Sequence, residues 1–118
     1  MQTRLIVAGT GNIVAERVHR ARTWRERGRG LLGREPLRPA EALVIEPARQ
    51  LHTFGMRYAI DVCLCDRDWR VLHVVPSMRP RRLTRWVPRS RFGVEMPAGS
   101  MPPLRPGDQL SLEEVSER

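Results

Sequence analysis

The segment from His52 to Asp61 holds the densest set of side chains that could do chemistry. It contains the imidazole of His52, the hydroxyl of Thr53, the guanidinium of Arg57 and the carboxylate of Asp61. A His–Asp pair can act as a general base when the two side chains hydrogen-bond. Gly55 lies between them, and a glycine there permits a bulge or tight bend that could re-aim the neighbouring side chains.

Two interpretations of this segment stay open. In the first, the segment borders a pocket for a small polar or anionic ligand, or contacts a protein partner, and Arg34 could fork onto a carboxylate of the protein or of the ligand. The candidate ligand-binding residues are then His52, Thr53, Met56, Arg57, Asp61, Arg34 and Glu95. In the second, His52 or Asp61 satisfies backbone amides and fixes the bend. Because no third catalytic partner is evident, we assign no catalytic residue, and a small hydrolase or isomerase using His52 and Asp61 is a minor alternative.

A second candidate site is the basic segment 76–91, which contains six Arg, three Pro and one Trp. Its arginines could contact phosphates, and its tryptophan could stack on a base. The candidate nucleic-acid-binding residues are Arg79, Arg81, Arg82, Arg85, Trp86, Arg89 and Arg91. The competing interpretation is a solvated loop whose arginine stems cover apolar surface. Aromatic residues make up only 5% of the chain, so nucleic-acid binding ranks second to the ligand or protein site.

The charge composition gives an ambiguous signal. The 118 residues carry a formal net charge of +8, and all 21 basic residues are arginine. Such a surplus is typical of proteins that bind nucleic acid, anionic membranes or acidic ligands. Lysine also binds phosphate well, so the absence of any lysine favours a coding bias as the origin of the charge.

Several kinds of site are excluded by what the sequence lacks. The turn Gly9-Thr10-Gly11-Asn12 has neither the lysine nor the helix start of a phosphate-binding loop. Cys63 and Cys65 are too few for a structural zinc site and are expected to be reduced thiols on one strand face. We therefore expect no metal and no cofactor.

The N-terminal apolar run, Leu5 to Ala8, is far too short for a signal-peptide core or a membrane span. We expect a cytoplasmic protein that does not contact a membrane. A length of 118 residues fits a single domain over 1–118.

The apolar patterns predict about eight short strands and one helix. The strands are expected at 4–8, 13–19, 42–46, 50–54, 58–65, 69–75, 92–96 and 109–115. Thr23 and Glu26 form a capping-box pattern, which predicts a short helix over 24–32 that ends at Gly33. Within 58–65, alternation places Ile60, Val62 and Leu64 in a core and turns Asp61 out of it. The fold class is mostly β, a sandwich or barrel, with one short helix in the N-terminal half.

Four stretches together resemble a known family. They are Ala21 to Arg34, His52 to Asp66, Val94 to Gly99 and Pro106 to Asp108. In this order and spacing they resemble domain of unknown function 192, over about 21–112. His52, Thr53, Phe54, Gly55, Met56 and Asp61 match its motif position by position, whereas Ala59 stands where the family usually has Pro. The resemblance implies a single, mostly β domain and no established activity. Many members carry an export-type N-terminus, which this sequence lacks.

Overall fold

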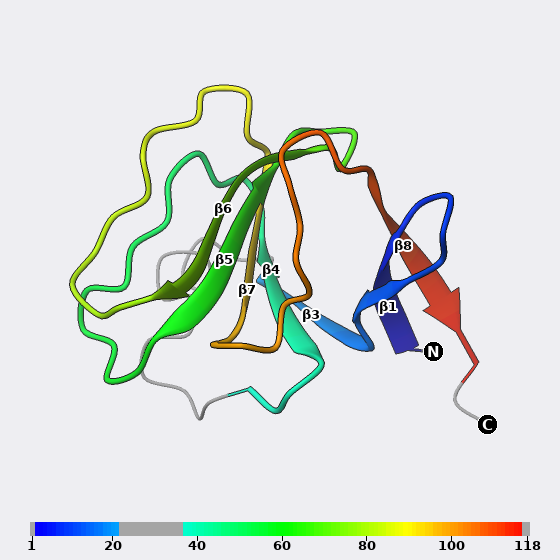
Figure 1. Cartoon of the computed structure of the whole chain (residues 1–118), viewed down its shortest axis with the longest axis horizontal. Coiled ribbons are helices and arrows are strands. Elements are labelled where there is room, and N and C mark those ends of the chain that lie inside the picture. The colour runs from blue at the N-terminus through cyan, green and yellow to red at the C-terminus, as the bar shows by residue number, and fades with distance from the viewer. Residues whose placement is uncertain (1, 22–36, 117–118) are drawn as a thin grey trace.

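The computed structural model describes residues 2–21 and 37–116, and these residues form eight strands and no helix (Figure 1). The strands are β1 (Gln2–Val7), β2 (Ile13–Ala15), β3 (Arg17–Ala21), β4 (Glu41–Ile45), β5 (Ile60–Cys65), β6 (Val71–Met78), β7 (Phe92–Pro97) and β8 (Leu110–Val115). The mostly β class is therefore confirmed. The predicted helix over 24–32 lies outside the described residues.

The strands form two sheets, one of three strands in the order β2-β1-β8 and one of five in the order β3-β4-β7-β5-β6. All neighbouring pairs are antiparallel except β3 and β4, which are parallel. The predicted continuous strand 13–19 is wrong in one respect, because the chain bends at Glu16 between β2 and β3. The Glu16 amide donates to the Ala40 carbonyl at 2.8 Å instead of pairing within a strand. Such a bend lets one stretch of chain serve two sheets.

The first core lies between the two sheets. Leu5 and Leu110 of the small sheet pack with Val44, Cys63 and Val94 of the large one. Removing this apolar surface from water at about 25 cal/mol per Å² is what holds the sheets together. The sandwich-type prediction is confirmed to the extent that two packed β-sheets share a core.

A second core covers the opposite face of the large sheet. It contains Ile60, Val62 and Leu64 of β5, packed against Leu51 and Val87 from irregular segments. All six residues of β5 are therefore buried. The predicted alternation is right, and Asp61 lies on the other face of β5, away from this core, as expected. That face is covered as well, so Asp61 is buried and not exposed.

The residues 47–53 that cover this face do not form the predicted strand 50–54. The only ladder contact there is an isolated bridge between His52 and Leu83. The segment approaches β7 closely at Gly93, where an added Cβ would lie 3.0 Å from Leu51 Cδ2. A glycine at this position therefore lets the covering segment pack directly on the sheet.

Cys63 and Cys65 are buried free thiols whose sulfur atoms lie 3.6 Å apart. The contact with Cys63 and the burial both raise the pKa of the Cys65 thiol. Since only the thiolate reacts with disulfide reagents, native protein at about pH 8 should show no rapid thiol reaction. Ellman's reagent should release two equivalents of product per chain only after denaturation. Fast reaction of the native protein would show that this part of the core opens readily.

Candidate functional site

Asp61 is a buried carboxylate that ties three segments together. Its side chain is 2% exposed. Oδ1 accepts a hydrogen bond from the Ser77 amide at 2.7 Å, and Oδ2 accepts from the Gly99 and Met101 amides at 3.0 Å each. Bonds to an ionised acceptor are stronger than neutral ones. Asp61 therefore fixes the end of β6 and the turn after β7, which is a structural role.

His52 and Asp61 do not form a pair. The imidazole of His52 is exposed, and its Nδ1 lies 3.2 Å from the Phe54 amide in its own bend. No hydrogen bond joins it to Asp61 in the described part of the chain, where three backbone amides occupy the carboxylate. Both side chains accept hydrogen bonds from backbone amides. This geometry agrees with the second interpretation, in which His52 and Asp61 fix the backbone.

Thr53 is fully buried and joins the bend to the basic segment. Its hydroxyl donates to the Arg79 carbonyl at 2.5 Å and accepts from the Arg82 amide at 3.0 Å. Its own amide donates to the Arg82 carbonyl at 3.0 Å, and the Arg81 amide donates to the Thr53 carbonyl at 3.2 Å. Thr53 thus has no polar group left for a ligand. The threonine is thus one of the connections between the two candidate sites of the sequence.

The remaining candidate ligand residues are scattered. Glu95 is buried and pairs with Val62, so its side chain lies on the sheet face opposite Asp61, which pairs with Met96. Arg57 is exposed and Met56 packs partly against the second core. Arg34 lies outside the described residues. The described members of the set therefore do not line one pocket.

Two segments far apart in the sequence instead form one surface, which we call the paired-loop face, made of residues 47–60 and 79–91. They run antiparallel and are joined by backbone hydrogen bonds: Thr84 N to Leu51 O at 2.9 Å and Val87 N to Arg49 O at 2.8 Å. The Thr84 hydroxyl also accepts from the Leu51 amide at 3.0 Å. In Figure 1 the two loops lie side by side, in teal-green and yellow. The exposed His52 and Arg57 of the first candidate set therefore lie on the same surface as the arginines of the basic segment.

The basic segment buries every third residue. Thr84, Val87 and Ser90 are 3%, 7% and 3% exposed, whereas the residues between them are exposed. A period of three is that of the polyproline II helix, which the prolines of the segment favour. Leu83, Trp86 and Arg89 consequently share one outward line, with further arginines at 82, 85 and 91 beside it.

Most arginines of this face have no acidic partner among the residues that the structure describes. Arg91 forms an ion pair with Glu46 at 3.0 Å. Arg79, Arg81, Arg82, Arg85 and Arg89 are exposed and form no ion pair with a residue that the structure describes. Their positive charges are therefore available to a partner.

The family model for domain of unknown function 192, described as uncharacterized ACR, matches residues 5–112. The chain belongs to this family. The match begins earlier than the 21–112 suggested by the motifs and includes the second half of β1 and all of β2. No protein with a curated description matches the sequence significantly.

Two crystal structures share the fold of this family member. A protein of unknown function from Novosphingobium aromaticivorans DSM 12444 superposes with a TM-score of 0.75 at 20% identity, over 92% of this chain and 83% of the other. A protein from Sinorhizobium meliloti 1021, described as a candidate transcription regulator, superposes with a TM-score of 0.71 at 19% identity. The superposition covers 93% of this chain and 91% of the other. At these identities the likeness shows the fold alone.

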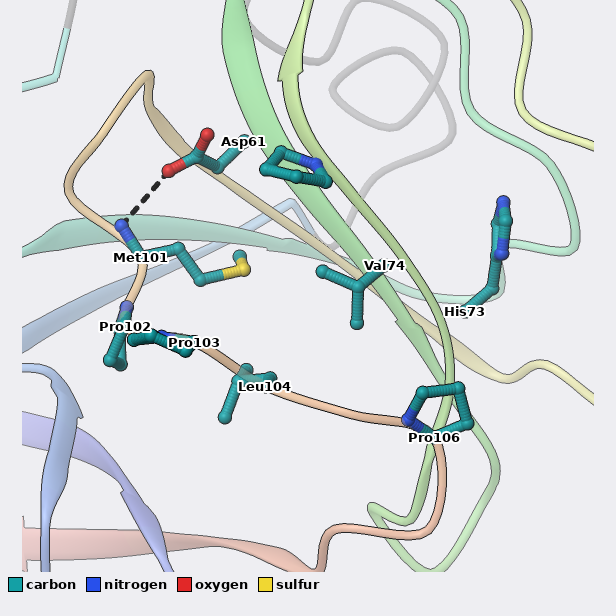
Figure 2. Close-up of a pocket in the computed structure, with 9 residues that line it drawn as sticks. Asp61, His73, Val74, Met101, Pro102, Pro103, Leu104 and Pro106 are labelled. Carbon is teal, nitrogen blue, oxygen red and sulfur yellow. Dashed lines mark hydrogen bonds between the residues drawn. The ribbon is translucent and has the colours of Figure 1, made fainter.

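A groove of about 500 Å³ lies on the other side of the edge strand β6 of this family member. Its walls are β6 and the segment 101–106, and Asp61 lies at one end (Figure 2). The lining residues are mostly apolar: Asp61, His73, Val74, Pro76, Met101, Pro102, Pro103, Leu104 and Pro106. Prolines have no N–H, so three positions of the segment cannot donate a hydrogen bond to the edge of β6, which bonds residues 107 and 108 only at Val71. The sequence pattern placed these residues in strands and turns without indicating the groove.

The described residues show neither a metal-binding cluster nor a membrane-spanning helix. No group of three or more His, Cys, Asp or Glu side chains lies close enough there to hold an ion. No helix in that part of the chain is long and apolar enough to cross a membrane.

Asp61→Asn tests the structural role of the carboxylate. An asparagine loses the ionic acceptor and turns an amide group toward backbone amides that are also donors. We expect the free energy of unfolding to fall by about 2 kcal/mol or more, measured by urea denaturation. Asp68→Asn is the matched control, because Asp68 is an exposed turn residue. Equal stability of the two variants would contradict the assigned role.

His73 lies on β6 with its ring directed away from Val74 (Figure 2). Burial, and second the guanidinium of Arg85, hold the pKa of His73 below its ordinary value. In an NMR titration His73 should therefore take up its proton at lower pH than an exposed histidine. Arg85→Ala should raise the pKa of His73 only in part, because the burial remains. An unchanged pKa in this variant would place Arg85 away from β6.

Proposed function

We propose that this domain binds an anionic polymer, a nucleic acid, on the paired-loop face. The observation that carries the proposal is the distribution of charge. Residues 47–60 and 79–91 contain eight arginines and no aspartate or glutamate, and the rest of the chain contains 13 arginines and 13 acidic residues. The whole net charge of +8 therefore belongs to these two segments. A coding bias explains why the bases are arginine, but it does not explain why acids are missing from two segments that pair in space.

The environment of these charges supports the same proposal. The arginines Arg79, Arg81, Arg82, Arg85 and Arg89 have no ion pair within the described residues, so binding need not break one first. Guanidinium groups match phosphate oxygens in a two-pronged geometry. Backbone hydrogen bonds join the two segments to each other, and the Arg91 amide donates to the Cys65 carbonyl of β5, which reduces the ordering cost of binding.

The bend at His52 takes part in this site without forming a separate pocket. His52 and Arg57 are exposed on the paired-loop face, whereas Thr53 and Asp61 are occupied by backbone groups. We therefore propose binding, not hydrolysis or isomerisation, as the activity around the bend. A protein partner remains the competing occupant and is separated from nucleic acid by the experiments below.

Fluorescence anisotropy with a labelled single-stranded oligonucleotide tests the proposal. Between about 50 and 200 mM salt, log K should fall linearly with log salt concentration, with a slope of about −0.7 for each phosphate contact. Arg85→Ala combined with Arg89→Ala removes two exposed charges, so the slope should become less steep by about 1.4.

Arg67→Ala combined with Arg105→Ala is the matched control. Both residues are exposed, neither belongs to the paired-loop face, and the pair removes the same charge. Binding that vanishes equally in both double variants would indicate attraction by net charge alone. Absence of binding to any oligonucleotide at low salt would refute the proposed function.

A further inference from the structure

The paired-loop face carries large exposed side chains that phosphate binding does not require. Phe54 is 47% exposed, Leu83 55% and Trp86 60%. The imidazole of His52 is exposed beside them. Of the four large hydrophobic residues exposed in the described part of the chain, three lie on this face and only Ile13 lies elsewhere. Apolar groups gathered at one surface mark an interaction site more strongly than single exposed residues do.

Three of these side chains lie together. The bridge between His52 and Leu83 places these two residues opposite each other. The rings of His52 and Phe54 are 5.8 Å apart and inclined at 30°. Leu83 and Trp86 follow the three-residue period of the basic segment, so Trp86 extends the same outward line. Aromatic and apolar side chains thus form a strip bordered by arginines, most of which have no ion pair with a described residue.

We infer that the paired-loop face takes single-stranded nucleic acid, with unstacked bases lying on Trp86, Phe54 and His52 and phosphates lying against the arginines. The inference rests on the proposed function and names the kind of strand. In a duplex the flat faces of the bases are covered by their neighbours, so exposed aromatic rings gain nothing from it. In a single strand each base offers a free face, and stacking on aromatic side chains is tolerant of sequence.

The charge of the face favours a nucleic acid over an acidic protein partner. The two segments contain no carboxylate, so they offer no group that could pair with basic residues of a protein surface. A strand that supplies a phosphate and a base at every repeat matches alternating guanidinium and apolar groups along its whole length. An acidic polypeptide supplies the charge but few flat faces.

The test compares two probes of equal charge. One is a thymidine oligonucleotide of about twelve nucleotides, which falls in the site-size range of such proteins. The other is an abasic phosphodiester of the same length, which has the phosphates without the bases. The full chain should bind the thymidine oligonucleotide more tightly by about 5- to 150-fold, the equivalent of stacking one base. Trp86→Ala should remove most of that difference while leaving the affinity for the abasic strand unchanged.

Variants and a duplex complete the design. Phe54→Ala should reduce the difference between the probes, and Trp86→Phe should retain much of it because phenylalanine keeps an aromatic face. Ile13→Ala is the control, since Ile13 is a similarly exposed apolar residue on β2. A duplex of the same length should bind more weakly than the thymidine strand at equal salt.

Three results would overturn the inference and leave the proposed function standing. They are equal affinity for the two single-stranded probes, tighter binding of the duplex, and a Trp86→Ala variant that still distinguishes the probes. Tighter binding of polyglutamate than of the thymidine strand would overturn it in favour of an acidic protein partner. Failure of every nucleic-acid probe to bind would instead refute the proposed function itself.

Discussion

The large sheet must be covered on both faces, and only one of them faces a second sheet. Strands β4, β5 and β7 bury apolar residues on both sides, so leaving one side in water would expose Leu43, Ile45, Ile60, Val62 and Leu64. Leu51 and Val87, from segments without regular secondary structure, cover this second face. Irregular backbone placed against a core has to satisfy its polar groups. The segments 47–53 and 81–91 do so by hydrogen-bonding to each other.

The pairing of these two covering segments determines which side chains lie on the outer surface. A segment that buries one residue in three turns the other two toward water, and along 79–91 those positions hold arginine, leucine, proline and tryptophan. The surface proposed to bind nucleic acid is thus the outer side of the layer that completes the core. Thr53 contributes to the core by burial and to the surface by fixing the backbone around Arg79 and Arg82.

Asp61 performs a similar task at the same, C-terminal end of β6. Its position in β5 turns the carboxylate toward Ser77, at the irregular end of β6, and toward the turn after β7, and three amides of these two segments converge on it. Ser77 there has a φ of 47°, a left-handed conformation that the hydrogen bond to Asp61 helps to hold. Near one end of β6 Asp61 holds the turn after β7, and at the start of the strand Val71 bonds Gly107 and Asp108; the proline-lined groove lies between these two connections. Asp61, whose residue type suggests a catalytic acid, therefore serves to fix the backbone of two neighbouring segments.

The sequence by itself determined the class of the fold, most of the strands and the residue types of the site. Alternation and turn residues located β1 and β4 to β8 because each strand has a local apolar pattern. The strand expected at 50–54 did not form, since the buried residues Leu51 and Thr53 belong to a covering segment whose partner is some thirty residues away. Only the tertiary structure decided that Asp61 is buried, that His52 lies apart from it, and that two basic segments form one surface. Those outcomes depend on long-range pairing and on which sheet face is covered, and neither is encoded in a local pattern.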